Sequence, residues 1–434
     1  MKLRDYKEIR DLFFGIDEKV YDYNGHRIDS INFDNAATTP VFKSTFPYIK
    51  GFSKTYASIG RGTGQKAEIT TQLYYESKSF LMDFFHIKDR DKYTVIYVNN
   101  TTEGINKLAK TLTKNDDEIV LISRMEHHSN DLPWRKRGKV EYIEIDKEGR
   151  LNFEELEEKL SNSLGKIRYV SLTGASNVTG YINDIHKIAK IVHKYEARLI
   201  VDAAQLVAHK EINISGSCEE EKIDFLVFSS HKIYSPFGIG VIIGLKEEFK
   251  NSLPDYLGGG TVELVLDNEV KYLEPPEKNE AGTPNFLGVM ALINSLKIVR
   301  TIQYSFIEEH EKILLKRILQ GLASIPKVIN YGDTINIYDR LGIAVFNIDG
   351  FYHRDVAEIL AKKRGISVRH GWFCAHPYCR RLMNVSEEEA KCFLEDYNKK
   401  MPGMIRVSFA PYNTVKEVDL FLNAIEDIVS GKLK

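Results

Sequence analysis

The chain has 434 residues, enough for one large and one smaller domain, each with its own hydrophobic core. Hydrophobic residues make up 43% and charged residues 28% of the sequence, which is ordinary for a globular protein. The formal net charge of −1 provides no bulk attraction to nucleic acid or to an anionic membrane, so we expect neither as a partner.

Membrane insertion and secretion are not expected. No stretch approaches the roughly 20 apolar residues that a membrane-spanning helix needs, and residues 1–14 lack the apolar core of a signal peptide. The cysteines Cys218, Cys374, Cys379 and Cys392 form neither CxxC pairs nor a disulfide framework. Free thiols are typical of a reducing compartment, and we therefore predict a cytoplasmic protein. Cys379 and Cys392 are expected to be buried and inert.

Strand-like and helical patterns alternate over the first 250 residues. Apolar, β-branched runs at 94–100, 118–123, 140–146, 167–173, 198–205 and 223–229 are separated by amphipathic or acid-rich stretches. Strands that alternate with helices of about 10 to 15 residues indicate βαβ units. The sequence therefore predicts an α/β fold with a mostly parallel central sheet.

The pattern changes after residue 250. A loop and hairpin region rich in Pro and charge leads into a long helical segment from about Leu287 to Ala323. The remainder, 324–434, mixes strands and helices and suits a smaller α+β domain. We expect an N-terminal segment (1–30) that packs on the small domain, a large domain (31–300) and a small C-terminal domain (301–434).

The stretch from Ile223 to Pro236 carries the clearest chemical signal. A buried strand ends in two serines, and His231 and Lys232 follow directly. In open α/β sheets, ligands bind outside the carboxyl ends of the strands. A lysine at that edge, beside hydroxyls and an imidazole, suits an amine nucleophile next to an anion site.

Two other strand ends offer partners for Lys232. Asp202 ends the strand at 198–202, and Gln205 follows three residues later. Asp202 is either a helix N-cap or a carboxylate that keeps a pyridine nitrogen protonated. Thr101 and Thr102 open a helix, where hydroxyls and free N–H groups serve as plain caps or as a phosphate cradle shared with Ser229 and His231.

Further polar residues follow the remaining strands. His127 and His128 are adjacent but have no acid or cysteine at a spacing suited to a metal, so we expect an imidazole that stacks on an aromatic cofactor. Asn177 is a turn residue or a substrate ligand. Arg406 lies within an apolar strand, and a buried arginine needs an anion such as a substrate carboxylate.

Cys374 lies in a turn close to Arg369, His370 and His376 in the sequence. Cationic neighbours favour the thiolate form of a cysteine, whereas a cysteine picked at random is more often buried and inert.

The candidate residues share one feature, which is that they follow the ends of successive strands. They are the lysine, the acid, the glutamine, the phosphate loop, the stacking histidine and the asparagine. Together they describe a site for pyridoxal phosphate (PLP).

These residues resemble the class V aminotransferase family of fold-type I PLP enzymes, and within it the SufS-like (group II) cysteine desulfurases and selenocysteine lyases. The resemblance covers nearly the whole chain, through the motifs FDNAATTP, TTEGIN, EHHSN, SNVTG, VDAAQ, SSHK, GGGT, EAGTPN, RHGWFCAHP and RVSFAPYNT. It implies a large PLP-binding domain, a smaller C-terminal domain and a homodimer.

The resemblance also implies residue roles. Lys232 would form the Schiff base with PLP and move protons at the substrate's α-carbon, and Cys374 would be the nucleophile that receives sulfur as a persulfide. His127 would stack on the cofactor ring, Asp202 would pair with the pyridine nitrogen, and Gln205 would bond the ring hydroxyl. The phosphate would be bound by Thr101, Thr102, Ser229 and His231, and Thr283 would reach the phosphate of the neighbouring subunit. The substrate carboxylate would be bound by Asn177 and Arg406, with Arg369 nearby.

The expected activity is removal of sulfur from L-cysteine, giving L-alanine and a persulfide for iron–sulfur assembly or another thiolation pathway through a sulfur-acceptor protein. One departure concerns the thiol: Trp372 and Phe373 replace the usual pair of histidines, so thiol activation would fall to groups such as His370 or His376. The alternative is another class V reaction (transamination, epimerisation, selenocysteine lysis or β-elimination) in which Cys374 is a bystander. A noncatalytic scaffold is disfavoured because the lysine and the acid are both present.

Overall fold

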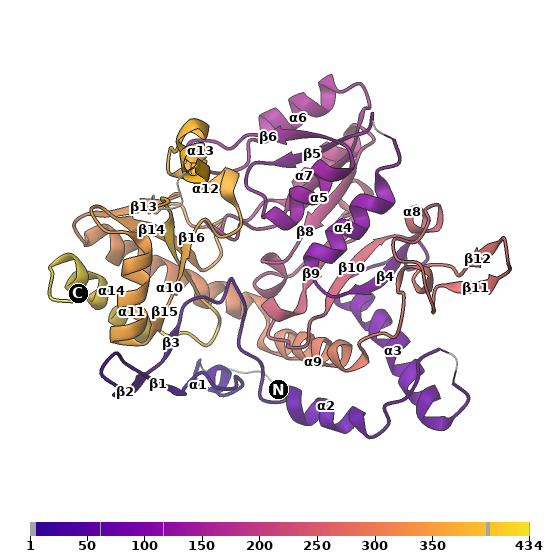
Figure 1. Ribbon diagram of the computed structural model, residues 1–434, viewed down its shortest axis with the longest axis horizontal. Helices are drawn as coiled ribbons and strands as arrows, with labels where there is room; N and C mark the ends of the chain where they lie inside the picture. The colour runs from indigo at the N-terminus through magenta and orange to yellow at the C-terminus, as the bar shows by residue number, and fades with distance from the viewer. Residues whose placement is uncertain (1–5, 61, 116, 396–399, 434) are drawn as a thin grey trace.

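A mostly parallel sheet forms the centre of the larger part of the molecule (Figure 1). The structure is a computed structural model that describes residues 6–60, 62–115, 117–395 and 400–433. Within these residues the central sheet has seven strands, in the spatial order β4 (Tyr93–Val98), β10 (Gly240–Leu245), β9 (Phe225–Ser229), β8 (Arg198–Asp202), β7 (Ile167–Thr173), β5 (Ile119–Ser123) and β6 (Lys139–Ile143).

The pairing of these strands confirms the predicted α/β fold. β5, β6, β7, β8 and β9 pair in parallel, whereas β10 pairs antiparallel with both β4 and β9. Every residue of β4, β9 and β10 is buried, as expected for a sheet with both faces covered. The helices of this region are α2 (Thr45–Ser53), α3 (Gln65–Phe84), α4 (Thr101–Leu112), α5 (Leu132–Arg137), α6 (Phe153–Asn162), α7 (Ile185–Lys194), α8 (Lys246–Lys250) and α9 (Phe286–Ile302).

The parallel arrangement brings the carboxyl ends of the strands to one edge of the sheet. α4 shows how a connection is built: Asn100 caps it by accepting the Glu103 N–H, and Ile105, Leu108 and Leu112 bury one face. Only two residues separate the end of β4 from the start of α4, so the N-terminus of α4 lies at the same edge.

The long helical segment expected from Leu287 to Ala323 is two helices. α9 ends at Ile302 and α10 (Tyr304–Ser324) begins after Gln303, with an angle of 75° between them. Gln303 has a φ of 75°, a left-handed conformation that interrupts the helical hydrogen bonds. Among the described residues no single helix is long and apolar enough to cross a membrane, and α9 and α10 meet that test only as this bent pair.

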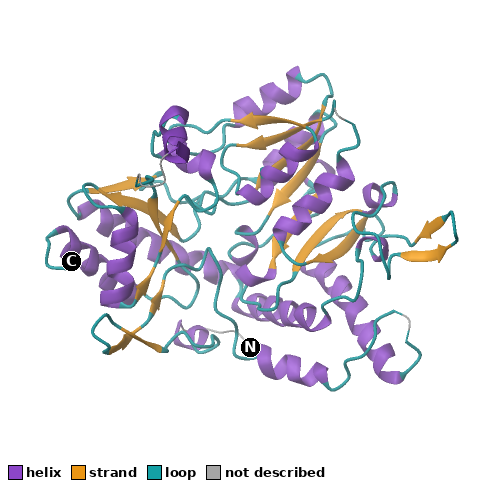
Figure 2. Cartoon of the chain, viewed as in Figure 1, coloured by secondary structure: helices purple, strands orange, loops and turns teal. Residues whose placement is uncertain are grey.

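A second hydrophobic core lies around a smaller sheet, at the left of Figures 1 and 2. Within the described ranges this sheet has four antiparallel strands, in the order β13 (Val328–Tyr331), β14 (Ile343–Ile348), β17 (Met404–Ser408) and β16 (Arg369–Gly371). α10, α11 (His353–Arg364), α12 (His376–Leu382), α13 (Glu387–Glu395) and α14 (Val415–Val429) complete this region.

The N-terminal elements lie against the smaller region. They are α1 (Tyr6–Arg10), the hairpin β1 (Lys19–Tyr21) and β2 (Arg27–Asp29), and β3 (Ile31–Asn32), which pairs in parallel with β15 (Ile366–Ser367). Arg10 in α1 forms an ion pair with Glu417 in α14. The bounds of the three domains stay a prediction.

A second hairpin projects from the larger region, at the far right of Figure 1. It consists of β11 (Val262–Val265) and β12 (Val270–Tyr272). Its strands are largely exposed, and Val265 has 59% of its surface accessible.

Candidate active site

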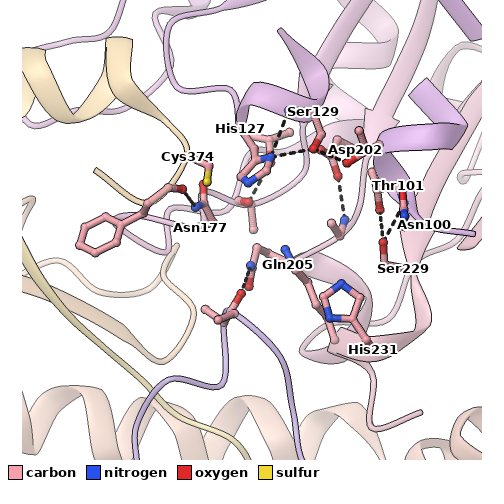
Figure 3. A pocket seen from close by; sticks show the side chains of 18 of the residues that line it. Asn100, Thr101, His127, Ser129, Asn177, Asp202, Gln205, Ser229, His231 and Cys374 are labelled. Carbon is pink, nitrogen blue, oxygen red and sulfur yellow. Dashed lines mark hydrogen bonds between the residues drawn. The ribbon is translucent and has the colours of Figure 1, made fainter. Parts of the chain in front are cut away.

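The predicted residues converge on one cavity at the carboxyl edge of the large sheet. Its volume is about 310 Å³, within the range of small-molecule sites. Among the sequence-predicted residues, those that line it are Thr101, Thr102, His127, Asn177, Asp202, Gln205, Ser229, His231, Lys232, Arg369, Cys374 and Arg406. Figure 3 shows many of these side chains around the opening.

Lys232 and Asp202 form the charged centre of this cavity. Burial lowers the pKa of Lys232 to about 8, and the negative charge of Asp202 acts in the opposite direction. Among the described residues, Asp202 and Arg406 influence the Lys232 amine through their charges, and neither forms a hydrogen bond with it. Asp202 ends β8 and accepts the Ala204 N–H at 2.9 Å. The amine is therefore available to react, beside a buried carboxylate.

Hydroxyl groups gather where α4 begins. Ser229, the last residue of β9, accepts the Thr101 N–H at 2.7 Å, and the two side-chain oxygens are also 2.7 Å apart. The hydroxyls of Thr102 and Ser129 form a second pair at 2.7 Å. Because α4 has 12 residues, its positive N-terminal dipole adds to these donors. This corner suits a phosphate.

His231 borders the same corner as a neutral imidazole. Burial and the nearby Lys232 charge lower its pKa to about 4. Its Nδ1 lies 3.2 Å from the hydroxyl oxygen of Thr38, and its backbone oxygen accepts hydrogen bonds from Thr38 and Thr39. The ring can therefore donate one hydrogen bond without carrying charge.

His127 is fixed as a neutral ring as well. Its Nδ1 accepts the Ser129 N–H at 3.1 Å, which leaves the proton on Nε2. Burial, together with the Lys232 charge, lowers its pKa to about 3. In the view of Figure 3 the ring lies between Cys374 and Asp202. The Gln205 amide is anchored in turn by donating to the Ala36 carbonyl at 2.7 Å.

Cys374 lies on a strained loop that reaches the cavity from the smaller region. Phe373 and Cys374 have φ values of 49° and 55°, and such left-handed conformations cost residues with side chains on the order of 1 kcal/mol each. Two contacts hold the loop: Asn177 Nδ2 donates to the Phe373 carbonyl at 2.8 Å, and the His128 N–H donates to the Cys374 carbonyl at 2.7 Å. Cys374 is exposed.

Arg406 lies in β17 and is almost fully buried, with 3% of its side chain exposed. It donates to Asp34 at 3.0 Å and to the Asn177 carbonyl at 2.8 Å, while its Nε has no partner among the described residues. Burial lowers the pKa of Arg406 and Asp34 raises it. Arg369 is exposed and lies 3.7 Å from the same carboxylate. The two arginines form a site for a small anion.

Sequence reasoning missed two acidic residues near the cavity. Asp34 belongs to the quoted FDNAATTP motif, and the need of buried Arg406 for an anion was the signal that pointed to it. Glu126 precedes His127 and is 2% exposed. Burial raises its pKa to about 8, so it remains largely protonated at neutral pH.

Several expected residues lie elsewhere. Thr283 is exposed and does not belong to the described lining of the cavity. His376 packs against His128, with ring centroids 4.5 Å apart, and His370 packs against His353 at 5.3 Å. The expectation that Cys392 is buried is wrong: its position on α13 leaves it exposed, whereas Cys379 is buried as predicted.

The residues present fit PLP. The cavity offers a buried amine that makes no hydrogen bond within the described part of the chain, a buried carboxylate, a neutral imidazole ring and a hydroxyl-lined helix N-terminus. These are the groups that an aldehyde, a pyridine nitrogen, an aromatic ring and a phosphate require, respectively.

Comparison with known proteins places these observations in a family. The family model "Aminotransferase class-V" matches residues 31–421. A "Probable cysteine desulfurase" of Pyrococcus abyssi is 35% identical over 92% of this chain and 94% of its own length. A cysteine desulfurase of Wigglesworthia glossinidia brevipalpis is 32% identical over 96% of each. The apo structure of a cysteine desulfurase from Thermococcus onnurineus superposes with a TM-score of 0.81 and 32% identity, covering 93% of this chain and 95% of that one.

Proposed function

Because the chain belongs to the class V aminotransferase family, we propose that it is a PLP-dependent cysteine desulfurase. It would convert L-cysteine to L-alanine and keep the sulfur as a persulfide on Cys374. One observation carries the proposal: Lys232, Asp202 and an exposed Cys374 line the same cavity. Similarity to cysteine desulfurases over nearly the full length supports it.

Each residue has a defined task in this reaction. When bound, PLP supplies an aldehyde for the substrate's amine and a ring that withdraws electrons. Asp202 would hold the ring nitrogen, and neutral His127 would stack on the ring without adding charge. With a pKa of about 8, Lys232 exchanges protons with the substrate's α-carbon near neutral pH. The phosphate would be held by Thr101, Thr102, Ser229 and His231, and the ring hydroxyl by Gln205.

Cys374 performs the sulfur transfer. Its thiolate attacks the substrate's sulfur, so that a sulfur–sulfur bond forms and the carbon–sulfur bond breaks. The electron pair of the broken bond stays with the substrate carbon, which takes up a proton and leaves as part of alanine. Arg406 and Arg369 bind the carboxylate and keep the substrate's sulfur oriented toward the thiol. An exposed Cys374 is also within reach of an acceptor thiol on another protein.

The test is a comparison of cysteine variants of the holoenzyme. We expect the wild type to release alanine and sulfide from L-cysteine in the presence of a reductant, and Cys374 to gain the mass of one sulfur atom. Cys374→Ala should lose these activities, whereas Cys218→Ala and Cys392→Ala, which alter exposed cysteines, should keep them. If Cys374→Ala still produced alanine and sulfide at the normal rate, Cys374 would be a bystander of another class V reaction.

A homodimer is part of the proposal. The loop before β11 and the β11–β12 hairpin expose large apolar side chains, including Leu257 at 70% and Leu264 at 53%. Gly282 donates to the Gly259 carbonyl at 2.9 Å, so Thr283 lies next to this surface. Sedimentation should show a dimer that Leu257→Asp weakens, and Thr283→Ala should release PLP more readily. A wild-type monomer that retains PLP would contradict both.

We also propose that the enzyme works in the cytoplasm. All four cysteines are free, which agrees with a reducing compartment.

A further inference from the structure

Asp34 neutralises a buried cation at the edge of the cavity. Its Oδ1 accepts a hydrogen bond from Arg406 at 3.0 Å, and 21% of the Asp34 side chain is exposed, against 3% for Arg406. Its second oxygen lies 3.7 Å from Arg369, whose side chain is 53% exposed. A buried guanidinium without an anion is strongly destabilising, so Asp34 accounts for how Arg406 is tolerated there.

The main chain fixes Asp34 independently of its carboxylate. The Ser408 N–H donates to the Phe33 carbonyl at 2.7 Å, and Asp34 forms a parallel bridge with Ser408. The Asp34 N–H donates to Asn32 Oδ1 at 3.0 Å. Because Arg406 lies two residues before Ser408 on β17, the backbone alone keeps Asp34 beside it. A change of the Asp34 side chain should therefore leave the local backbone in place.

Arg406 is held on three sides. Asp34 and the Asn177 carbonyl bind two of its nitrogens, and the ring of Phe373 lies 5.1 Å from the guanidinium carbon. Its Nε is buried and has no partner among the described residues. Both Arg406 and Arg369 line the cavity, whereas Asp34 is not in its described lining. Asp34 therefore pairs with both arginines without itself belonging to the described lining of the cavity.

We propose that Asp34 is a positioning residue, which orients Arg406 and Arg369 to receive the carboxylate of an amino-acid substrate. A guanidinium that is already oriented loses less side-chain entropy when the carboxylate binds. The inference rests on the proposed function only in assuming that the substrate is an amino acid. It extends the site to a residue outside the cavity wall.

The experiment compares two ligands that differ only in the carboxylate. Holoenzyme carrying Asp34→Ala or Asp34→Asn is titrated with L-alanine and with ethylamine, and binding is followed by the visible absorbance of the cofactor. We expect Asp34→Ala to bind L-alanine about tenfold more weakly, as for the loss of one charged hydrogen bond. Asp34→Asn keeps an acceptor oxygen and should therefore lose less affinity for L-alanine. Ethylamine binding should not change in either variant, and the KM for L-cysteine should rise while kcat is retained.

Asp419→Ala is the matched control, because it removes an exposed ion pair with Arg317, 2.7 Å long, between α10 and α14. It should behave as wild type. If the Asp34 variants lost affinity for L-alanine and ethylamine equally, Asp34 would have a merely structural role and the proposal would be overturned. Unchanged L-alanine binding would also overturn it. Tighter L-alanine binding by Asp34→Asn would mean that Asp34 competes with the substrate, which also overturns it. The comparison requires no sulfur removal, so failure of the desulfurase assignment is measured separately.

Discussion

The two sides of the cavity are built in different ways. On the sheet side, Asp202 and Ser229 are the last residues of strands, and Lys232 follows within three residues. On the thiol side, Cys374 lies on a loop with two successive left-handed residues. Contacts from Asn177 and His128, distant in the sequence, hold that loop.

This difference separates two sources of precision. The sheet side is positioned by ladders of backbone hydrogen bonds, which a single side-chain change does not disturb. The thiol side depends on a few long-range contacts that offset local strain. Side-chain changes on the sheet side should therefore affect chemistry or charge while the geometry remains. On the thiol side they should displace the reacting sulfur.

The largest expected effect comes from Lys232. Lys232→Ala should lower kcat by roughly a thousandfold or more, since it removes the amine that we propose binds the cofactor covalently and moves the proton. The variant should fold normally, because the strand that precedes it is unchanged. Alanine release and borohydride trapping of the cofactor measure the effect, with exposed Lys194→Ala as control. A variant that retained covalent PLP would contradict the assignment.

Glu126 tests whether the sheet side tolerates a change of charge. The carboxyl of the unfolded chain loses its proton near pH 4.5, whereas burial raises the folded pKa to about 8. Between these values the folded state binds more protons, so stability falls as the pH rises. Glu126→Gln removes this dependence and can still pair with both neighbours, because its amide oxygen accepts from Asn130 Nδ2 and its amide NH2 can donate to the Ser123 hydroxyl, which reverses that hydrogen bond.

Urea unfolding from pH 4.5 to pH 8 should therefore show the stability of Glu126→Gln rising relative to that of the wild type, by roughly 4 kcal/mol at pH 8. Exposed Glu154→Gln should show no such trend. A constant difference at every pH would show that Glu126 is ionised in the folded protein.

The same contrast explains what the sequence predicts. Strand ends can be predicted from the sequence, because an apolar run that breaks at Asp202 or Ser229 places that side chain at the edge of a parallel sheet. The fold and the lining of the cavity followed from this pattern together with the family resemblance. The sequence did not predict the antiparallel direction of β10 or the helix break at Gln303, because both depend on packing between distant segments.

The thiol side was not predictable in its geometry. The left-handed conformations of Phe373 and Cys374 are imposed by contacts with Asn177 and His128, which no local propensity reports. The expectation that His370 or His376 would serve the thiol lacks support in the geometry, because each ring packs against another histidine and is not part of the described cavity lining. Asp34 was likewise found only when Arg406 was placed beside it.

Asn177 tests the thiol side. Asn177→Ala removes the hydrogen bond to the Phe373 carbonyl, and the strained loop should relax away from the cavity. We expect sulfur removal to slow roughly tenfold, because small displacements of reacting atoms are costly. Binding of ethylamine, followed by the cofactor's absorbance, should remain unchanged. Exposed Asn251→Ala is the control, and equal losses in both measurements would show that Asn177 supports the cofactor rather than the loop.

The smallest expected effect concerns the sheet side, and it is a dependence of the rate of PLP uptake on pH. Only the neutral amine of Lys232 reacts with an aldehyde, and burial lowers its pKa to about 8. Uptake of PLP by the apoprotein should therefore rise about fivefold between pH 7 and 8 and level off above that value. Stopped-flow absorbance measures this rate. An uptake rate that kept increasing toward pH 10.5, as for an ordinary lysine, would show that the amine is solvated. The burial that makes the sheet side reactive would then be absent.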